Sequence, residues 1–164
     1  MISNPVLSEE LTDFKSKYRM LVQLYTNRIE FHDVQTKTKR TSRVVLIQDI
    51  SGSALSKIKD NDFKAYLTIY TYVRQKNGKR KREELVMELN EFKTYEENFR
   101  RAVHWDTELN ILLKTSENAL AQKPLLIFVN PKSGAGKAKN IFYERALTIF
   151  NEAKVPHVLV MTGK

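Results

Sequence analysis

The stretch PLLIFVNPKSGAGKA, residues 124–138, decides the fold of the C-terminal part of the chain. It opens with a continuous apolar run at 125–129, which is typical of a buried strand. A turn with two glycines follows, then an amphipathic helical pattern at 138–153 and a second apolar run at 156–161. Two strands joined through a helix normally pair in parallel. The order therefore predicts one β-α-β unit.

The turn inside this unit, Asn130-Pro-Lys-Ser-Gly-Ala-Gly-Lys137, suits an anionic ligand. Backbone amides at the start of a helix are unpaired, and the helix dipole is positive there. Glycines let the backbone approach a phosphate closely, and Lys132 and Lys137 add positive charge. We therefore predict a phosphate-binding turn, and the alternative is an ordinary strand-to-helix turn rich in glycine and serine.

The two commonest phosphate-binding patterns do not fit this turn. A Walker A loop needs glycine where Pro131 stands and a hydroxyl residue where Ala138 stands. The dinucleotide pattern needs its third glycine where Lys139 stands. The turn is therefore neither a Walker A loop nor a dinucleotide-binding loop.

The N-terminal part of the chain reads as β-structure. Residues 17–88 alternate between apolar and polar side chains, most clearly at 66–72. The pair Asn77-Gly78 then predicts a two-residue hairpin turn with a return strand at 82–89.

A helix is predicted to follow these strands. Thr94-Tyr-Glu-Glu97 fits a capping box, and apolar residues recur at helical spacing through Lys114, with one helix or two shorter ones both compatible with Asp106-Thr107. Strands followed by one helix are the plan of pleckstrin-homology-like domains, an analogy at the level of fold. The predicted fold class is α+β: a pleckstrin-homology-like β-sandwich with a C-terminal helix in residues 1–114, a linker at 115–123, and the β-α-β unit at 124–164.

The composition of the chain indicates which partners and which kinds of site are expected. The 164 residues carry a net charge of +9, which favours anionic partners, and no cysteine, which excludes disulfides and cysteine-based zinc sites. The three histidines lie far apart, so no metal site is predicted. The N-terminus has no signal-peptide pattern, and no apolar run approaches the roughly 18 residues of a membrane span. We expect a cytoplasmic protein that associates peripherally with membranes.

A predicted basic hairpin is the second candidate site. Its cations are Arg74, Lys76, Lys79, Arg80, Lys81 and Arg82, and a second cluster comprises Lys37, Lys39, Arg40 and Arg43. If both lie at one end of the domain, they form a rim for anionic lipid, worth about 1 kcal/mol per cation. The membrane-binding candidates are Lys76, Lys79, Arg80, Lys81 and Arg82. A nuclear localisation signal and a solvated hairpin are the alternatives. Nucleic acid is not an expected partner, because interleaved exposed aromatics are not evident.

The sequence LLIFVNPKSGAGKAKNIF resembles the opening of the catalytic domain in the diacylglycerol-kinase-like lipid kinases. The sphingosine and ceramide kinase branch is the most similar. Upstream, IYTY and TYEENFRRAVHW resemble the same branch, as does Met161-Thr162 at the end of the following strand. The Tyr-Glu-Glu-Asn stretch and Trp105 favour sphingosine kinase over ceramide kinase.

This resemblance implies an activity and a site. The family transfers the γ-phosphate of ATP, with Mg²⁺, to a lipid hydroxyl, here the primary hydroxyl of sphingosine or another sphingoid base. It implies that 124–164 begin an α/β nucleotide-binding domain. The residues implied to surround the ATP phosphates are Asn130, Pro131, Lys132, Ser133, Gly134, Gly136 and Lys137, with Thr162 near the nucleotide.

Other parts of the family's machinery do not occur in these residues. The family's second nucleotide element, of Gly-Gly-Asp-Gly type, is absent, and no aspartate follows Asp106, so no catalytic base or Mg²⁺ ligand is assigned. We therefore expect an N-terminal fragment, a short isoform or a truncated product that is inactive alone. The alternative function is a non-catalytic module, pleckstrin-homology-like, that binds a membrane or a protein.

Overall fold

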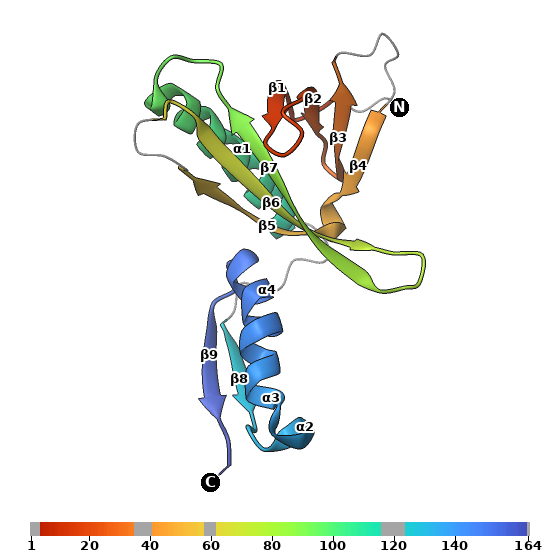
Figure 1. Cartoon of the computed structure of the whole chain (residues 1–164), viewed down its shortest axis with the longest axis vertical. Coiled ribbons are helices and arrows are strands. Elements are labelled where there is room, and N and C mark those ends of the chain that lie inside the picture. The colour runs from red at the N-terminus through yellow and green to blue at the C-terminus, as the bar shows by residue number, and fades with distance from the viewer. Residues whose placement is uncertain (1–3, 35–40, 58–61, 116–123, 164) are drawn as a thin grey trace. The chain divides into compact units, whose positions relative to one another are not determined.

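The computed structural model describes residues 4–34, 41–57, 62–115 and 124–163. The chain divides into two compact units, Met1–Ala119 and Leu120–Lys164, with a mixed α+β structure (Figure 1). Most of the predicted linker lies outside the described residues, and so do Lys37, Lys39 and Arg40 of the predicted rim.

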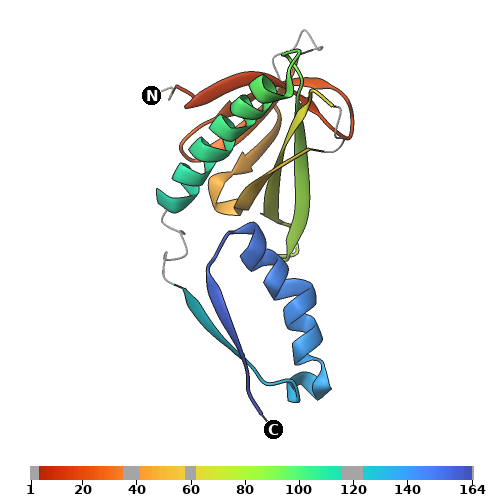
Figure 2. The same cartoon turned by 90° about the vertical axis from the view of Figure 1, so that its left-hand side faces the viewer.

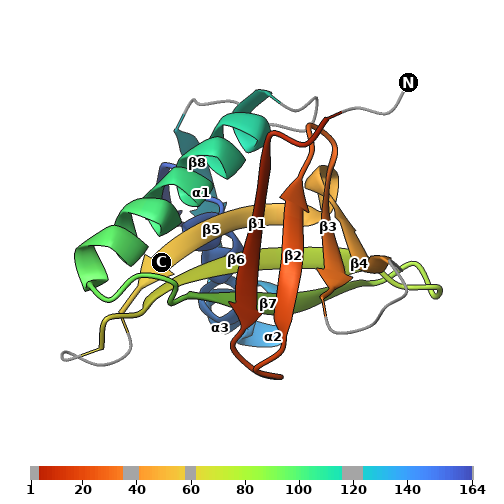
Figure 3. The ribbon, with the colours of Figure 1, turned by 90° about the horizontal axis from the view of Figure 1, so that it is seen from above.

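Unit 1 is built on a seven-stranded antiparallel sheet in the order β4-β3-β2-β1-β7-β6-β5. In Figure 3 the strands β1 to β4 cross the strands β5 to β7 at a steep angle, so the sheet folds over on itself. A short 3-10 turn, Ile47–Asp49, connects the two groups. The strands are β1 Leu7–Asp13, β2 Arg19–Leu24, β3 Arg28–Asp33, β4 Thr41–Leu46, β5 Ile50–Ser56, β6 Ala65–Arg74 and β7 Arg80–Leu89.

Strand β1 lies before residues 17–88, where alternation is predicted, and β5 lies within them without being predicted as a separate strand. Each contains polar residues that have partners inside the unit. In β1, one oxygen of Glu9 accepts hydrogen bonds from the indole of Trp105 at 2.9 Å and from Arg101 at 2.8 Å. In β5, the buried Ser53 hydroxyl donates to Asp106 at 2.5 Å.

Helix α1, Tyr95–Thr115, covers the core of unit 1 and is a single helix (Figure 2). The predicted capping box is present in modified form: the Thr94 hydroxyl accepts the Glu97 amide at 3.4 Å and donates to the Glu97 carboxylate at 2.6 Å. The side chain of Trp105 is 1% exposed and packs among the apolar residues of the sheet. The helix thus closes one side of the core.

The hairpin between β6 and β7 differs from the two-residue turn predicted from Asn77-Gly78. The strands pair as far as Arg74 and Arg80, and the Gln75 amide donates to the Lys79 carbonyl at 2.7 Å. Only Gly78 has a positive φ, of 79°, whereas the predicted turn needs two such residues. The connection is therefore a longer turn that ends in a left-handed glycine.

Unit 2 is one β-α-β unit, as the sequence predicts. Strand β8, Leu125–Val129, pairs in parallel with β9, His157–Met161. Between them run α3 Ala138–Ile141, a π-helical segment Phe142–Ala146 and α4 Leu147–Glu152, on one face of the strand pair (Figures 1 and 2). On the other face Leu126, Phe128 and Val158 are 59%, 62% and 56% exposed, so these strands are buried on one face only.

A buried carboxylate joins three segments of unit 1. The side chain of Glu88, in β7, is 3% exposed and accepts ion pairs from Lys17 at 3.2 Å and Lys64 at 2.8 Å. Burial raises the pKa of Glu88, but the hydrogen bonds from Lys64 and Lys17 outweigh burial and hold the pKa below its ordinary value. The charged form of Glu88 therefore stabilises the folded state.

We expect Glu88→Gln to lower the free energy of unfolding of unit 1 by about 2 kcal/mol at pH 7, because charged hydrogen bonds are lost. The stabilisation is complete above the pKa of an unfolded glutamate, about 4.3, and is lost as pH falls through the lower folded-state pKa. Urea unfolding followed by Trp105 fluorescence measures it. The control is Glu84→Gln, which removes an exposed ion pair. An equal loss of unfolding free energy in both variants, with the same size at low pH as at pH 7, would contradict the account.

Candidate phosphate-binding turn

The turn after β8 is held by hydrogen bonds that begin at Asn130. The Asn130 side-chain oxygen accepts the Lys132 amide at 3.0 Å, and its carbonyl accepts the Ser133 amide at 3.0 Å. These bonds fold the chain back directly after the strand. They also leave Ser133–Gly136, the short segment α2, at the start of the crossover.

Three successive residues of α2 have left-handed backbone conformations. The φ angles of Gly134, Ala135 and Gly136 are 59°, 56° and 78°. This conformation is ordinary for glycine, but it costs roughly 1–2 kcal/mol for a residue with a side chain. Sequence reasoning did not find Ala135, because an alanine gives no sign of a left-handed conformation. Strain of this kind clusters at ligand-binding segments.

The end of β9 lies beside the start of this turn. The Thr162 amide donates to the Val129 carbonyl at 2.9 Å, and a Cβ built on Gly163 would lie 3.3 Å from the side-chain oxygen of Asn130. The carboxyl ends of parallel strands meet at one edge of a sheet, and ligands of α/β proteins bind outside that edge. The structure therefore brings Thr162 next to the glycine turn, and it adds Gly163 to the residues predicted from sequence.

The remaining predicted residues give the turn its charge. Lys132, Ser133 and Lys137 are exposed, and Pro131 is half-buried. The helix that runs through α3 and α4 begins directly after Lys137. Helix amides, left-handed glycines and two ammonium groups can together bind a phosphate and neutralise its charge. Binding of this kind requires no acid or base residue.

The cations of the β6–β7 hairpin are not equivalent. Arg80 pairs with Asp49 at 2.6 Å, Lys81 with Glu83 at 3.0 Å and Arg82 with Glu84 at 2.5 Å. Lys76 and Lys79, at the tip, make no ion pair with any residue that the structure describes. Of the second cluster, the described Arg43 pairs with Glu83 at 2.6 Å. Among the described cations of the predicted rim, Arg43, Arg80, Lys81 and Arg82 are thus neutralised within unit 1.

The described residues contain no helix that is both long and apolar enough to cross a membrane. They also contain no group of three or more His, Cys, Asp or Glu side chains arranged to hold a metal ion.

We expect Ala135→Gly to stabilise unit 2 and Gly136→Ala to destabilise it, each by roughly 0.5–1 kcal/mol. A Cβ on Gly136 would meet nothing within 4 Å, so the effect comes from the backbone alone. Hydrogen exchange of the β8 and β9 amides measures both changes. Two variants that shift exchange in the same direction would show that α2 is not left-handed in solution.

Comparison with known proteins supports a relationship to sphingosine kinases. No protein-family model matches the chain. The chain is 28% identical to human sphingosine kinase 2 over 176 residues, which cover 99% of this chain and 27% of that protein. The chain therefore spans about a quarter of the length of this relative. The similarity runs through both units, the strand–turn–helix of unit 2 included.

Proposed function

We propose that the chain is the N-terminal part of an ATP-dependent lipid kinase that phosphorylates the primary hydroxyl of sphingosine or another sphingoid base. The observation that carries the proposal is the left-handed glycine turn at the carboxyl edge of β8 and β9. Similarity to human sphingosine kinase 2 supports the substrate class.

In this proposal the turn positions ATP through its phosphates. The Gly134 amide approaches the phosphate oxygens, and Lys132 and Lys137 neutralise their charge. The Ser133 and Gly136 amides hold the turn in shape by donating to the Asn130 and Lys132 carbonyls. Asn130 and Pro131 fix the backbone as it leaves β8, and Thr162 lies beside the nucleotide. Positioning and neutralisation are most of what phosphoryl transfer requires of a protein.

The proposed groups fit ATP better than they fit Mg²⁺. The ion prefers oxygen ligands, usually carboxylates together with phosphates. The turn offers amides, ammonium groups and hydroxyls, and Asn130–Lys137 contains no carboxylate. We therefore assign no Mg²⁺ ligand and no catalytic base here, and we expect the 164 residues to be inactive as a kinase on their own.

For unit 1 we propose a pleckstrin-homology-like domain at residues 1–114, followed by a linker at 115–123 and the start of a catalytic domain at 124–164. A folded-over seven-stranded antiparallel sheet with one C-terminal helix supports this assignment. An alternative function, a module that binds anionic membranes or a protein without catalysis, is favoured by Lys76 and Lys79 at the hairpin tip, which make no ion pair with a described residue.

We expect Lys137→Ala to weaken the binding of a fluorescent ATP analogue to the chain by about tenfold, the effect of losing roughly 1.4 kcal/mol of phosphate contact. Arg145→Ala is the control, because it removes one exposed cation from the same crossover two turns beyond the predicted site. Equal affinities of the two variants would leave the turn without a role in nucleotide binding.

We also expect the double variant Lys76→Ala/Lys79→Ala to reduce sedimentation with anionic vesicles more than Lys81→Ala/Arg82→Ala. The first pair has no ion-pair partner in the described structure, whereas the second is neutralised by Glu83 and Glu84. Each cation near the surface contributes about 1 kcal/mol. Equal binding of the unaltered chain to neutral vesicles would exclude the membrane-binding function.

A further inference from the structure

Strand β7 has an open edge along its N-terminal half. It pairs with β6 along its whole length, but with β1 only at Met87 and Glu88. One more bond joins β7 to the end of β1, from the Phe14 amide to the Val86 carbonyl at 2.9 Å. Beyond Phe14 the chain turns away into β2, so no described strand lies beside β7 before Val86.

The backbone of Glu84 faces this open side. The Val86 carbonyl points toward β1, whereas the Glu83 carbonyl accepts the Thr71 hydroxyl of β6 at 3.3 Å. Successive residues of an antiparallel strand direct their backbone groups to opposite edges. The N–H and C=O of Glu84 therefore point the same way as those of Val86, where no strand is present among the described residues.

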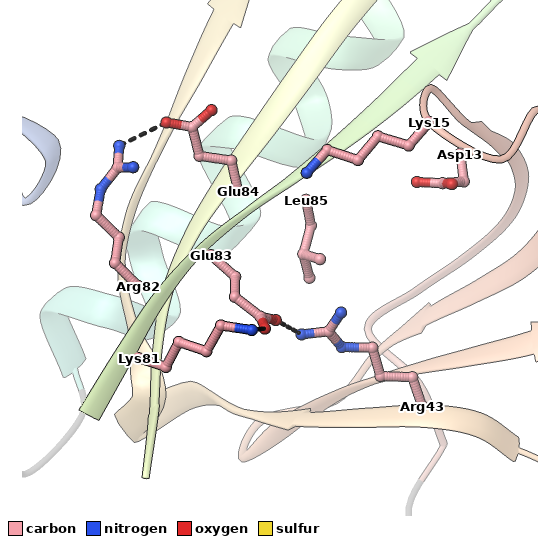
Figure 4. A pocket seen from close by; sticks show the side chains of 8 residues that line it. All are labelled: Asp13, Lys15, Arg43, Lys81, Arg82, Glu83, Glu84 and Leu85. Carbon is pink, nitrogen blue, oxygen red and sulfur yellow. Dashed lines mark hydrogen bonds and ion pairs between the residues drawn. The ribbon is translucent and has the colours of Figure 1, made fainter. Parts of the chain in front are cut away.

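An open surface depression of about 610 Å³ lies along this edge. Side chains from the end of β1 and the following turn, from β4 and from β7 converge on it (Figure 4). We name it the β7 groove; its lining residues are Asp13, Lys15, Arg43, Lys81, Arg82, Glu83, Glu84 and Leu85.

Some charged side chains of the β7 groove are ion-paired with one another, and Lys15 is not. Glu83 accepts two cations, Arg43 at 2.6 Å and Lys81 at 3.0 Å, and these bonds lower the pKa of its carboxyl group. Lys15 makes no ion pair with any described residue, and Figure 4 shows its side chain reaching toward β7 beside Leu85. One further carboxylate would find Lys15 as its cationic partner here. A multiply charged phosphate would place all its charge at one point among the carboxylates of Asp13, Glu83 and Glu84, whereas a peptide can place a single carboxylate beside Lys15.

We propose that the β7 groove binds an extended acidic peptide, which adds as a strand to the open edge of β7. The peptide backbone pairs with the N–H and C=O of Glu84, as in other cases of strand addition. Alternate side chains of a strand share one face, so one carboxylate of the peptide can reach Lys15, which makes no ion pair with a described residue. The half-buried Leu85 gives the groove an apolar floor. This proposal requires neither a nucleotide nor a membrane.

The test uses the isotope-labelled 164-residue chain and the capped peptide Val-Glu-Val-Glu-Val-Glu. Amide shifts of Lys15 and of β7 before Val86 are expected to move on titration. Lys15→Glu should weaken the affinity by roughly tenfold, because one attraction becomes a repulsion. Lys76→Glu makes the same change of charge at the hairpin tip, outside the groove, and should leave the affinity within about twofold.

A second peptide tests strand pairing itself. Replacing the central valine with proline removes a backbone donor and should abolish binding, because proline cannot pair on that side. Full binding of the proline peptide, or equal weakening in the Lys15→Glu and Lys76→Glu variants, would overturn the proposal. So would a loss of anionic-vesicle binding in Lys15→Glu that exceeds the loss in Lys76→Glu, because the groove would then serve a membrane.

Discussion

Parallel pairing of β8 and β9 is the constraint on which the candidate site depends. Strands of a parallel pair can be joined only through a crossover, and that crossover has to leave the sheet at its carboxyl edge. In this chain the bond from the Thr162 amide to the Val129 carbonyl closes the pair at that edge. The turn from Asn130 to Lys137 therefore starts beside the end of β9, and groups distant in sequence come to lie around one small region.

Unit 1 is held together by an apolar core and by ion pairs and hydrogen bonds of the polar groups that enter it. Its sheet folds over a core of aliphatic residues, and α1 covers that core with Trp105. Polar groups that enter the interior are paired, as Glu9 is with Trp105 and Arg101 and as Glu88 is with its two lysines. Ion pairs also neutralise four of the described cations of the predicted basic rim, namely Arg43, Arg80, Lys81 and Arg82. Lys76 and Lys79 at the hairpin tip and Lys15 in the β7 groove are cations of unit 1 that make no ion pair with a described residue.

Much of the fold could be predicted from sequence where apolar periodicity is strong. The limits of β8 and the parallel unit follow from a continuous apolar run, and β6 follows from alternation. Strand β1 was missed, and β5 was not separated within residues 17–88, because Glu9 and Ser53 have partners more than 50 residues away, on α1. Ala135 was missed because neighbouring backbone, and not its own side chain, sets its conformation. The predicted length of the hairpin turn was wrong, because Asn77-Gly78 is compatible with more than one turn type.

The most direct measurement of the central claim is paramagnetic line broadening of the labelled chain by ATP loaded with Mn²⁺, which broadens the signals of amides close to the nucleotide phosphates. The account predicts that the amides of residues 132–138 and of Thr162 and Gly163 broaden first, and that the β1–β7 sheet keeps its signals. Broadening concentrated on the hairpin tip or the β7 groove, with the glycine turn unaffected, would contradict it.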